Sequence, residues 1–148
     1  MATNPRVPQG TLNRIRGSIV LPDLPELNVT APFLGRGGIS FGLQGESTVM
    51  IPTMTGAVTS PEPYMMAAVT INLLKTQALA AAWRTRMELD ARIGDLTIWP
   101  DATTFPRYTV SNCAIVSVRE MSFAGDDAGY VLVVHGYYDV NSSMWNLV

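Results

Sequence analysis

The stretch from Met65 to Pro100 reads MMAAVTINLLKTQALAAAWRTRMELDARIGDLTIWP. Its beginning alternates with the period of a β-strand, because Val69, Ile71 and Leu73 fall on one face. The alanine-rich run from Ala78 to Ala82 then has high helix propensity. An extended pattern resumes before Pro100. The stretch therefore predicts a strand, a helix and a second strand, and it contains the one convincing helix of the chain.

The helix has its own start, stop and packing signals. Thr76 is the expected N-cap, and Gly94 suits the left-handed position that ends a helix. Leu79, Trp83 and Met87 follow at spacings of four, so we expect them to share a buried face. A single amphipathic helix between strands is a packing element for a sheet.

The opposite face of the helix is charged. Arg84 with Glu88, and Arg86 with Asp90, stand four residues apart. Such pairs are worth about 0.2–0.5 kcal/mol each on an exposed helix. This face is therefore predicted to point to solvent.

Alternation also predicts strands before and after this unit. The expected extended segments are Arg14–Leu21, Leu27–Thr30, Ile39–Gln44, Tyr108–Val118 and Tyr130–Val140, with turns at Gly35–Gly38 and Ala124–Gly129. The last strand is apolar on both faces, which predicts cover on both sides. We expect one domain over residues 1–148, mainly β with six or seven strands and one helix.

Two segments lack this periodicity. Residues 1–13 are polar and contain proline and glycine, and they read as an extended arm. Residues 45–63 carry several apolar side chains without a regular period, and a loop of that length is uncommon in a compact domain. A long contact loop and an additional hairpin are equally compatible with this segment.

Composition narrows the classes of function. Hydrophobic residues make up 47% and charged residues 15%, which indicates either a large core or a surface covered by copies of the same chain. A net charge of −2 and a single lysine, Lys75, disfavour nonspecific binding to a phosphate backbone. The lone Cys113 excludes an internal disulfide framework. No signal-like or membrane-spanning apolar run is present, so we expect an intracellular chain that does not insert into membranes.

Candidate chemical groups are few. His135 is the only histidine, and Asp139 lies about 13 Å further along the same predicted strand. Cys113 has no neighbouring cation and is interpreted as a small buried apolar residue. Asp126 and Asp127 stand in a glycine-flanked turn, where aspartate is common. The sequence predicts no enzyme activity, no metal and no cofactor.

Six segments resemble one family. They are LPELNVTAP (24–32), GRGGISFGLQGE (35–46), PTMTGAVTSPEPYM (52–65), VTINLLKTQALAAAW (69–83), GDLTIWPD (94–101) and YTVSNCAIVSV (108–118). In this order they resemble the tail tube proteins of long-tailed bacteriophages, most closely those with contractile tails. The resemblance implies a β-barrel or sandwich with one flanking helix, assembled into hexameric rings that stack into a hollow tube. The tube of type VI secretion systems has a similar fold.

The resemblance also implies roles for particular residues. The small and polar side chains expected to face the lumen are Ser40, Gly42, Gln44, Thr70 and Asn72. The residues expected to contact the adjacent ring, within segment 45–63, are Met50, Ile51, Met54 and Val58.

The implied partners are further copies of the chain, the tail sheath, the baseplate, the tape measure protein and the tail terminator. DNA would pass through the lumen without specific binding. The expected location is the virion tail, assembled in the cytoplasm of the host bacterium. Three alternatives remain: a secretion-type or phage-like particle tube, a monomeric β-sandwich binding domain with segment 45–63 as its ligand surface, and an enzyme.

Overall fold

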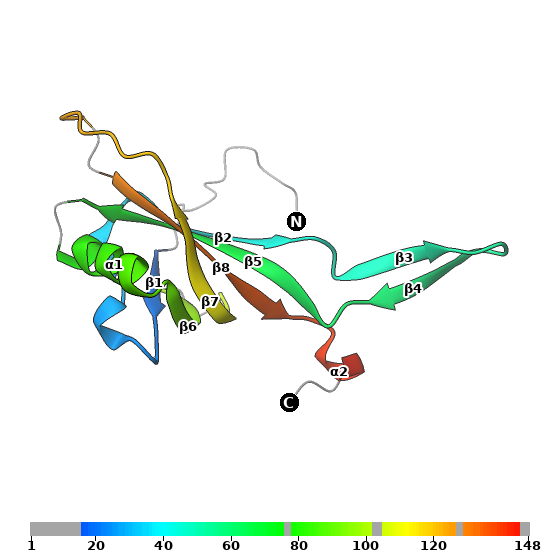
Figure 1. Ribbon diagram of the computed structural model, residues 1–148. Coiled ribbons are helices and arrows are strands. Elements are labelled where there is room, and N and C mark those ends of the chain that lie inside the picture. Colours follow the sequence, from blue (N-terminus) through cyan, green and yellow to red (C-terminus); the bar gives the residue numbers. More distant parts are fainter. Residues whose placement is uncertain (1–15, 76–77, 102–104, 127–128, 146–148) are drawn as a thin grey trace, which may run out of the picture.

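The computed structural model describes residues 16–75, 78–101, 105–126 and 129–145, and it is mainly β (Figure 1). The predicted arm at residues 1–13 and the predicted N-cap Thr76 lie outside the described residues. The strands are β1 (Gly17–Val20), β2 (Leu34–Gln44), β3 (Thr48–Pro52), β4 (Ala57–Pro61), β5 (Tyr64–Leu74), β6 (Arg92–Pro100), β7 (Tyr108–Val118) and β8 (Gly129–Asp139). The helices are α1 (Ala78–Leu89) and the short α2 (Ser142–Trp145), with 3-10 turns η1 (Pro25–Leu27) and η2 (Ala31–Phe33).

Six strands form one antiparallel sheet in the order β1-β6-β7-β8-β5-β2, and β3 and β4 form a separate two-stranded sheet. The large sheet curls strongly. The rings of Phe41 on β2 and Tyr108 on β7 stack at 4.9 Å between centroids, although β5 and β8 lie between these strands in the sheet order. A Cβ at Gly17 of β1 would lie 3.5 Å from Ile39 Cδ1 of β2, so the two ends of the sheet nearly meet. The predicted class, a mainly β barrel-like fold with one main helix, is confirmed.

The core fills the inside of this curl. Its buried apolar residues come from the five strands β1, β5, β6, β7 and β8, from η1 and from α1, and include Ile19, Leu27, Val69, Ile71, Leu73, Leu96, Val110, Leu132 and Val134. Helix α1 lies at the end of the sheet opposite the β3–β4 hairpin (Figure 1). Leu79 and Trp83 are buried, and Met87 packs against the core as a partly buried side chain.

The predicted end of the helix is wrong. Helix α1 ends at Leu89, and Asp90 redirects the chain, because its carboxylate accepts hydrogen bonds from the backbone N–H and the guanidinium of Arg92 at 3.1 Å. Gly94 does adopt a left-handed conformation (φ +76°), but within β6, where the pairing with β7 shifts register. It forms a β-bulge and not a helix cap.

The predicted turn at Gly35–Gly38 is also wrong. These residues belong to β2, whose pairing with β5 shifts register between Leu34 and Ile39. Gly38 has φ +62°, and its carbonyl accepts a hydrogen bond of 2.9 Å from the Asn72 side chain. The glycines therefore allow a bulge inside a continuous strand.

Other predicted segments are found with shorter or altered bounds. The strand predicted at Arg14–Leu21 is observed as β1, and Arg14 lies outside the described residues. The expected extended piece at Leu27–Thr30 is reduced to one bridge, in which Ile19 and Val29 exchange backbone hydrogen bonds of 2.8 and 2.9 Å. No helix in the described ranges is long and apolar enough to cross a membrane.

Candidate assembly surface

The hairpin of β3 and β4 projects beyond the curled sheet as an arm that continues from β2 and β5 (Figure 1). Segment 45–63 is thus a hairpin, the second of the two structures that the sequence allowed. The strands pair from Thr48 with Pro61 to Pro52 with Ala57. At the tip, the backbone N–H and the hydroxyl of Thr53 both donate to the Gly56 carbonyl, at 2.7 and 3.0 Å.

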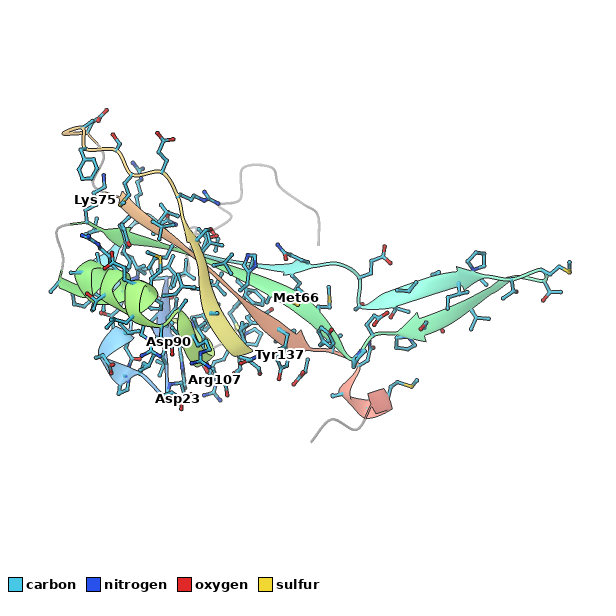
Figure 2. The ribbon with its side chains drawn as sticks, in the orientation of Figure 1. Asp23, Met66, Lys75, Asp90, Arg107 and Tyr137 are labelled. Carbon is cyan, nitrogen blue, oxygen red and sulfur yellow. The ribbon has the colours of Figure 1, made fainter. Side chains whose placement is uncertain are left out.

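The residues expected to contact an adjacent ring are all exposed on this hairpin. Met50 is 57% exposed, Ile51 48%, Met54 104% and Val58 54%. Ile51 pairs with Val58, so they share a face, while Met50 lies on the opposite face and Met54 in the turn. Side chains extend from both sides of the arm (Figure 2). Because an isolated two-stranded hairpin is marginally stable in water, two apolar faces of this kind favour partners on both sides.

The hairpin carries no charged side chain from Ser47 to Pro61. The nearest acids, Glu46 and Glu62, flank its base. Charged residues on an exposed strand are a usual protection against pairing with other chains. The hairpin lacks that protection along its whole length, so it has the composition of a contact surface.

The apolar surface continues from the hairpin onto the outer face of the large sheet. Met66 of β5 lies opposite Tyr137 of β8, and both are labelled in Figure 2. They are 45% and 37% exposed. The Tyr137 ring is 5.8 Å from that of Tyr64, which is also exposed. This end of the sheet and the hairpin together carry exposed apolar side chains that include Val49, Met50, Ile51, Met54, Val58, Tyr64, Met66 and Tyr137.

The residues expected to face a lumen lie together on the outer face of β2 and β5. Ser40 pairs with Thr70, Gly42 with Ala68, and Gln44 with Met66. Ser40, Gly42 and Gln44 are exposed, whereas Thr70 and Asn72 are partly buried. Asn72 also supports the β2 bulge through its bond to Gly38, a role the sequence analysis did not identify.

The same face is less polar on β8. Val131 pairs with Asn72 and Val133 with Thr70, and both valines are only partly buried. The expected cover on both sides of β8 is therefore wrong for the single chain: the core covers one face completely and leaves the other partly open. His135 belongs to this open face, opposite Ala68 and Ala114, so its cross-strand neighbours supply no acid or nucleophile.

The other candidate groups are placed without a reactive partner. Cys113 is buried and its thiol donates to the Val110 carbonyl at 3.2 Å. Burial, followed by the charge of Asp95, raises the pKa of this thiol to about 12. Asp126 is described and exposed, and Asp127 lies outside the described residues. Within the described ranges, no group of three or more His, Cys, Asp or Glu side chains is arranged to hold a metal ion.

A second surface feature is a groove of about 490 Å³ between α1 and the connection from β7 to β8. Its walls are mainly apolar and include Met87, Val118, Met121, Phe123 and Tyr130. At its rim Arg84 and Glu88 form the predicted ion pair at 3.0 Å, and the Lys75 ammonium lies 5.6 Å from the Phe123 ring. The charged groups at the rim are thus held by an ion pair and by an ammonium–ring contact, and the groove between them is lined mainly by apolar side chains.

Sequence reasoning missed the residue that ties the hairpin to the sheet. Asn141 follows β8 and donates from its side-chain amide to the Ser47 and Glu62 carbonyls, both at 2.8 Å. Its left-handed backbone (φ 54°) is a conformation that asparagine tolerates better than most residues. An asparagine directly after a long strand is a weak signal, and its partners are distant in sequence.

Comparison with solved structures finds similarity to the anti-feeding prophage cap, the tube terminating cap of that particle, determined by cryo-electron microscopy. The sequence identity is 16%, the alignment covers 94% of this chain and 91% of that chain, and the TM-score is 0.48. No family model and no curated protein matches the chain.

Proposed function

We propose that this chain is a structural subunit of a tail-like tube, in which hexameric rings stack around a lumen. The observation that carries the proposal is the uncharged, two-faced apolar hairpin, which reaches beyond its own barrel. The resemblance of six sequence segments to phage tail tube proteins supports the same assignment.

The sheet edges also favour assembly. Strands β1 and β2 stand at the ends of the sheet order, and β2 pairs only with β5 within the described residues. An edge strand as long as Leu34–Gln44 presents unpaired backbone groups to other chains. Pairing this edge with a neighbouring subunit would satisfy these backbone groups and extend the sheet around a ring.

The proposed lumen is the outer face of β2 and β5, with Ser40, Gly42, Gln44, Thr70 and Asn72. Small and polar side chains suit the passage of a polyanion. With a net charge of −2 and a single lysine, the chain is expected to attract the phosphate backbone only weakly. In this proposal the chain belongs to a virion tail assembled in the bacterial cytoplasm, with a sheath, baseplate, tape measure protein and terminator as partners. A secretion-type or phage-like particle tube would assemble in the same way and differ in its cargo.

Negative-stain electron microscopy and light scattering of the purified chain test this proposal. The full chain is expected to form rings or hollow tubes with six-fold symmetry. Ile51→Glu places a charge on the hairpin and is expected to leave a folded subunit that does not stack. Leu89→Glu is the matched control, because Leu89 is 80% exposed and belongs to α1, which lies at the other end of the sheet from the hairpin (Figure 1).

The same measurements can overturn the proposal. A chain that stays monomeric at high concentration would favour the binding-domain alternative. Deletion of Thr48–Ser60 is a second test. If this variant still forms tubes of full length, the hairpin is not the contact between rings.

A further inference from the structure

The base of the hairpin is hydrogen-bonded to the segment that follows β8. Ser47 directly precedes β3 and Glu62 directly follows β4, and the Glu62 N–H donates to the Ser47 carbonyl at 2.9 Å. The Asn141 amide adds one hydrogen bond to each of these two carbonyls, at 2.8 Å. One side chain after β8 therefore joins both strands of the hairpin to the barrel.

The covalent connections alone do not fix the direction of the hairpin. On one side the chain passes from β2 through Gly45 (φ +88°), and on the other it passes through Glu62 and Pro63 into β5. Apart from the chain neighbours, no atom lies within 4 Å of a Cβ built on Gly45, so that side of the joint is open. Beside Asn141, Val140 donates to the Pro63 carbonyl at 3.2 Å.

The local geometry suits asparagine in two ways. The side-chain amide supplies two N–H donors, and the two carbonyls accept both. The left-handed backbone aims the side chain across the base of the hairpin, and the Asn141 carbonyl accepts from Met144 as α2 begins. Aspartate has nearly the same shape but no donor, and its charge would face two carbonyl oxygens.

We propose that Asn141 is the positioning residue that sets the angle between the hairpin and the barrel. The angle can be measured on the free subunit. Its consequence for stacking rests on the proposed function, because a hairpin that swings freely must lose orientational freedom at every contact it makes.

The angle is measured by pulsed electron spin resonance between spin labels at Thr55→Cys in the hairpin turn and Leu89→Cys on α1. The native thiol does not interfere, because Cys113 is buried and its pKa is raised to about 12. The parent is expected to give one narrow distance distribution. Asn141→Asp and Asn141→Gly are expected to lose this narrow peak, the second variant while keeping a residue that readily adopts the left-handed backbone.

The control is Asn112→Gly, which makes the same change at the other left-handed asparagine (φ 51°), on β7. It is expected to keep the parent distribution. Unchanged distributions in both Asn141 variants, or a parent distribution already as broad as theirs, would overturn the inference.

Electron microscopy of the same variants separates the two proposals. Unchanged distances with normal tubes in Asn141→Asp would reject the positioning role and leave the tube proposal standing. A broadened distribution in a chain whose parent forms no rings or tubes would reject the tube proposal and keep the positioning role. If both are correct, the Asn141→Asp variant shows a broadened distribution and loses most of its tubes, whereas Asn112→Gly assembles as the parent does.

Discussion

Trp83 is the largest fully buried side chain among the described residues, at 0% exposure, yet its Nε1 has no acceptor there. We expect Trp83→Ala to lower the free energy of unfolding by about 3–5 kcal/mol, because it empties the contact between α1 and the sheet. Trp83→Phe should cost less, since it keeps most of the ring volume and removes the unpaired N–H. Urea unfolding followed by circular dichroism measures both, and equal losses in the two variants would contradict this account.

Asp90 makes a pH-dependent contribution to the stability of the fold. Hydrogen bonds from the Arg92 side chain, then from its backbone N–H, lower the pKa of this carboxyl from 3.8 to about 2. A lowered pKa in the folded state means that ionised Asp90 stabilises the fold above the unfolded pKa of 3.8, and that this is lost as pH falls towards 2. Asp90→Asn should therefore lower Tm at neutral pH, with the difference from the parent closing between pH 4 and pH 2. A difference that stays constant over that range would rule out the ionised carboxylate as its source.

At the scale of elements, the sequence predicts local periodicity well and glycine function poorly. The spacing of Leu79, Trp83 and Met87 is sufficient to predict α1, because the buried residues of a helix recur at its own period. Gly38 and Gly94 do adopt positive φ, but the sequence suggested a turn and a helix end where the fold has bulges. Whether a left-handed glycine makes a turn, a cap or a bulge depends on which strand lies beside it, and that strand comes from elsewhere in the chain.

Gly136 offers a test of one such bulge. It lies on β8 beneath the register shift of β7, and a Cβ there would approach Val110 Cγ1 to 2.6 Å and both Cys113 Sγ and the Ser111 carbonyl to 2.8 Å. Gly136→Ala should lower the free energy of unfolding by about 1–3 kcal/mol through overpacking. Gly42→Ala on β2 is the control, because nothing lies within 4 Å of its added Cβ. Similar losses at the two positions would indicate a general cost of replacing glycine in a strand and not overpacking at the bulge.

Over the whole molecule, the exposed apolar side chains of segment 45–63 could be predicted from the sequence. The contacts that hold this segment against the sheet could not. Segment 45–63 lacks strand periodicity because both faces of its hairpin are open and apolar, so alternation carries no signal there. The residues proposed to face the lumen share one face of the sheet, since Ser40 and Thr70 pair directly. One sequence does not reveal the register between distant strands. That register places Val131 and Val133 beside these residues and brings Asn141 to the base of the hairpin.

The absence of charge from Ser47 to Pro61 predicts how the proposed assembly responds to salt. Sodium chloride should leave self-association nearly unchanged, because no ion pair on the hairpin is available to be screened. Ammonium sulfate should strengthen it, because sulfate favours burial of apolar surface. Light scattering across a salt series measures both effects, with Ile51→Glu as the control that stays unassembled. A steep loss of association in sodium chloride would point to charged contacts away from the hairpin.

The long pairing of β5 with β8 has a mechanical consequence. The two strands pair at every position from Tyr64 with Asp139 to Leu74 with Gly129, without a register shift. A pull on the hairpin enters the barrel along β5, and the hydrogen bonds of an antiparallel pair lie perpendicular to that direction. Tension therefore loads the whole row of bonds in shear at once and does not open them one after another. In the proposed tube, stretching a column of subunits would separate neighbouring copies before it unravelled any one of them.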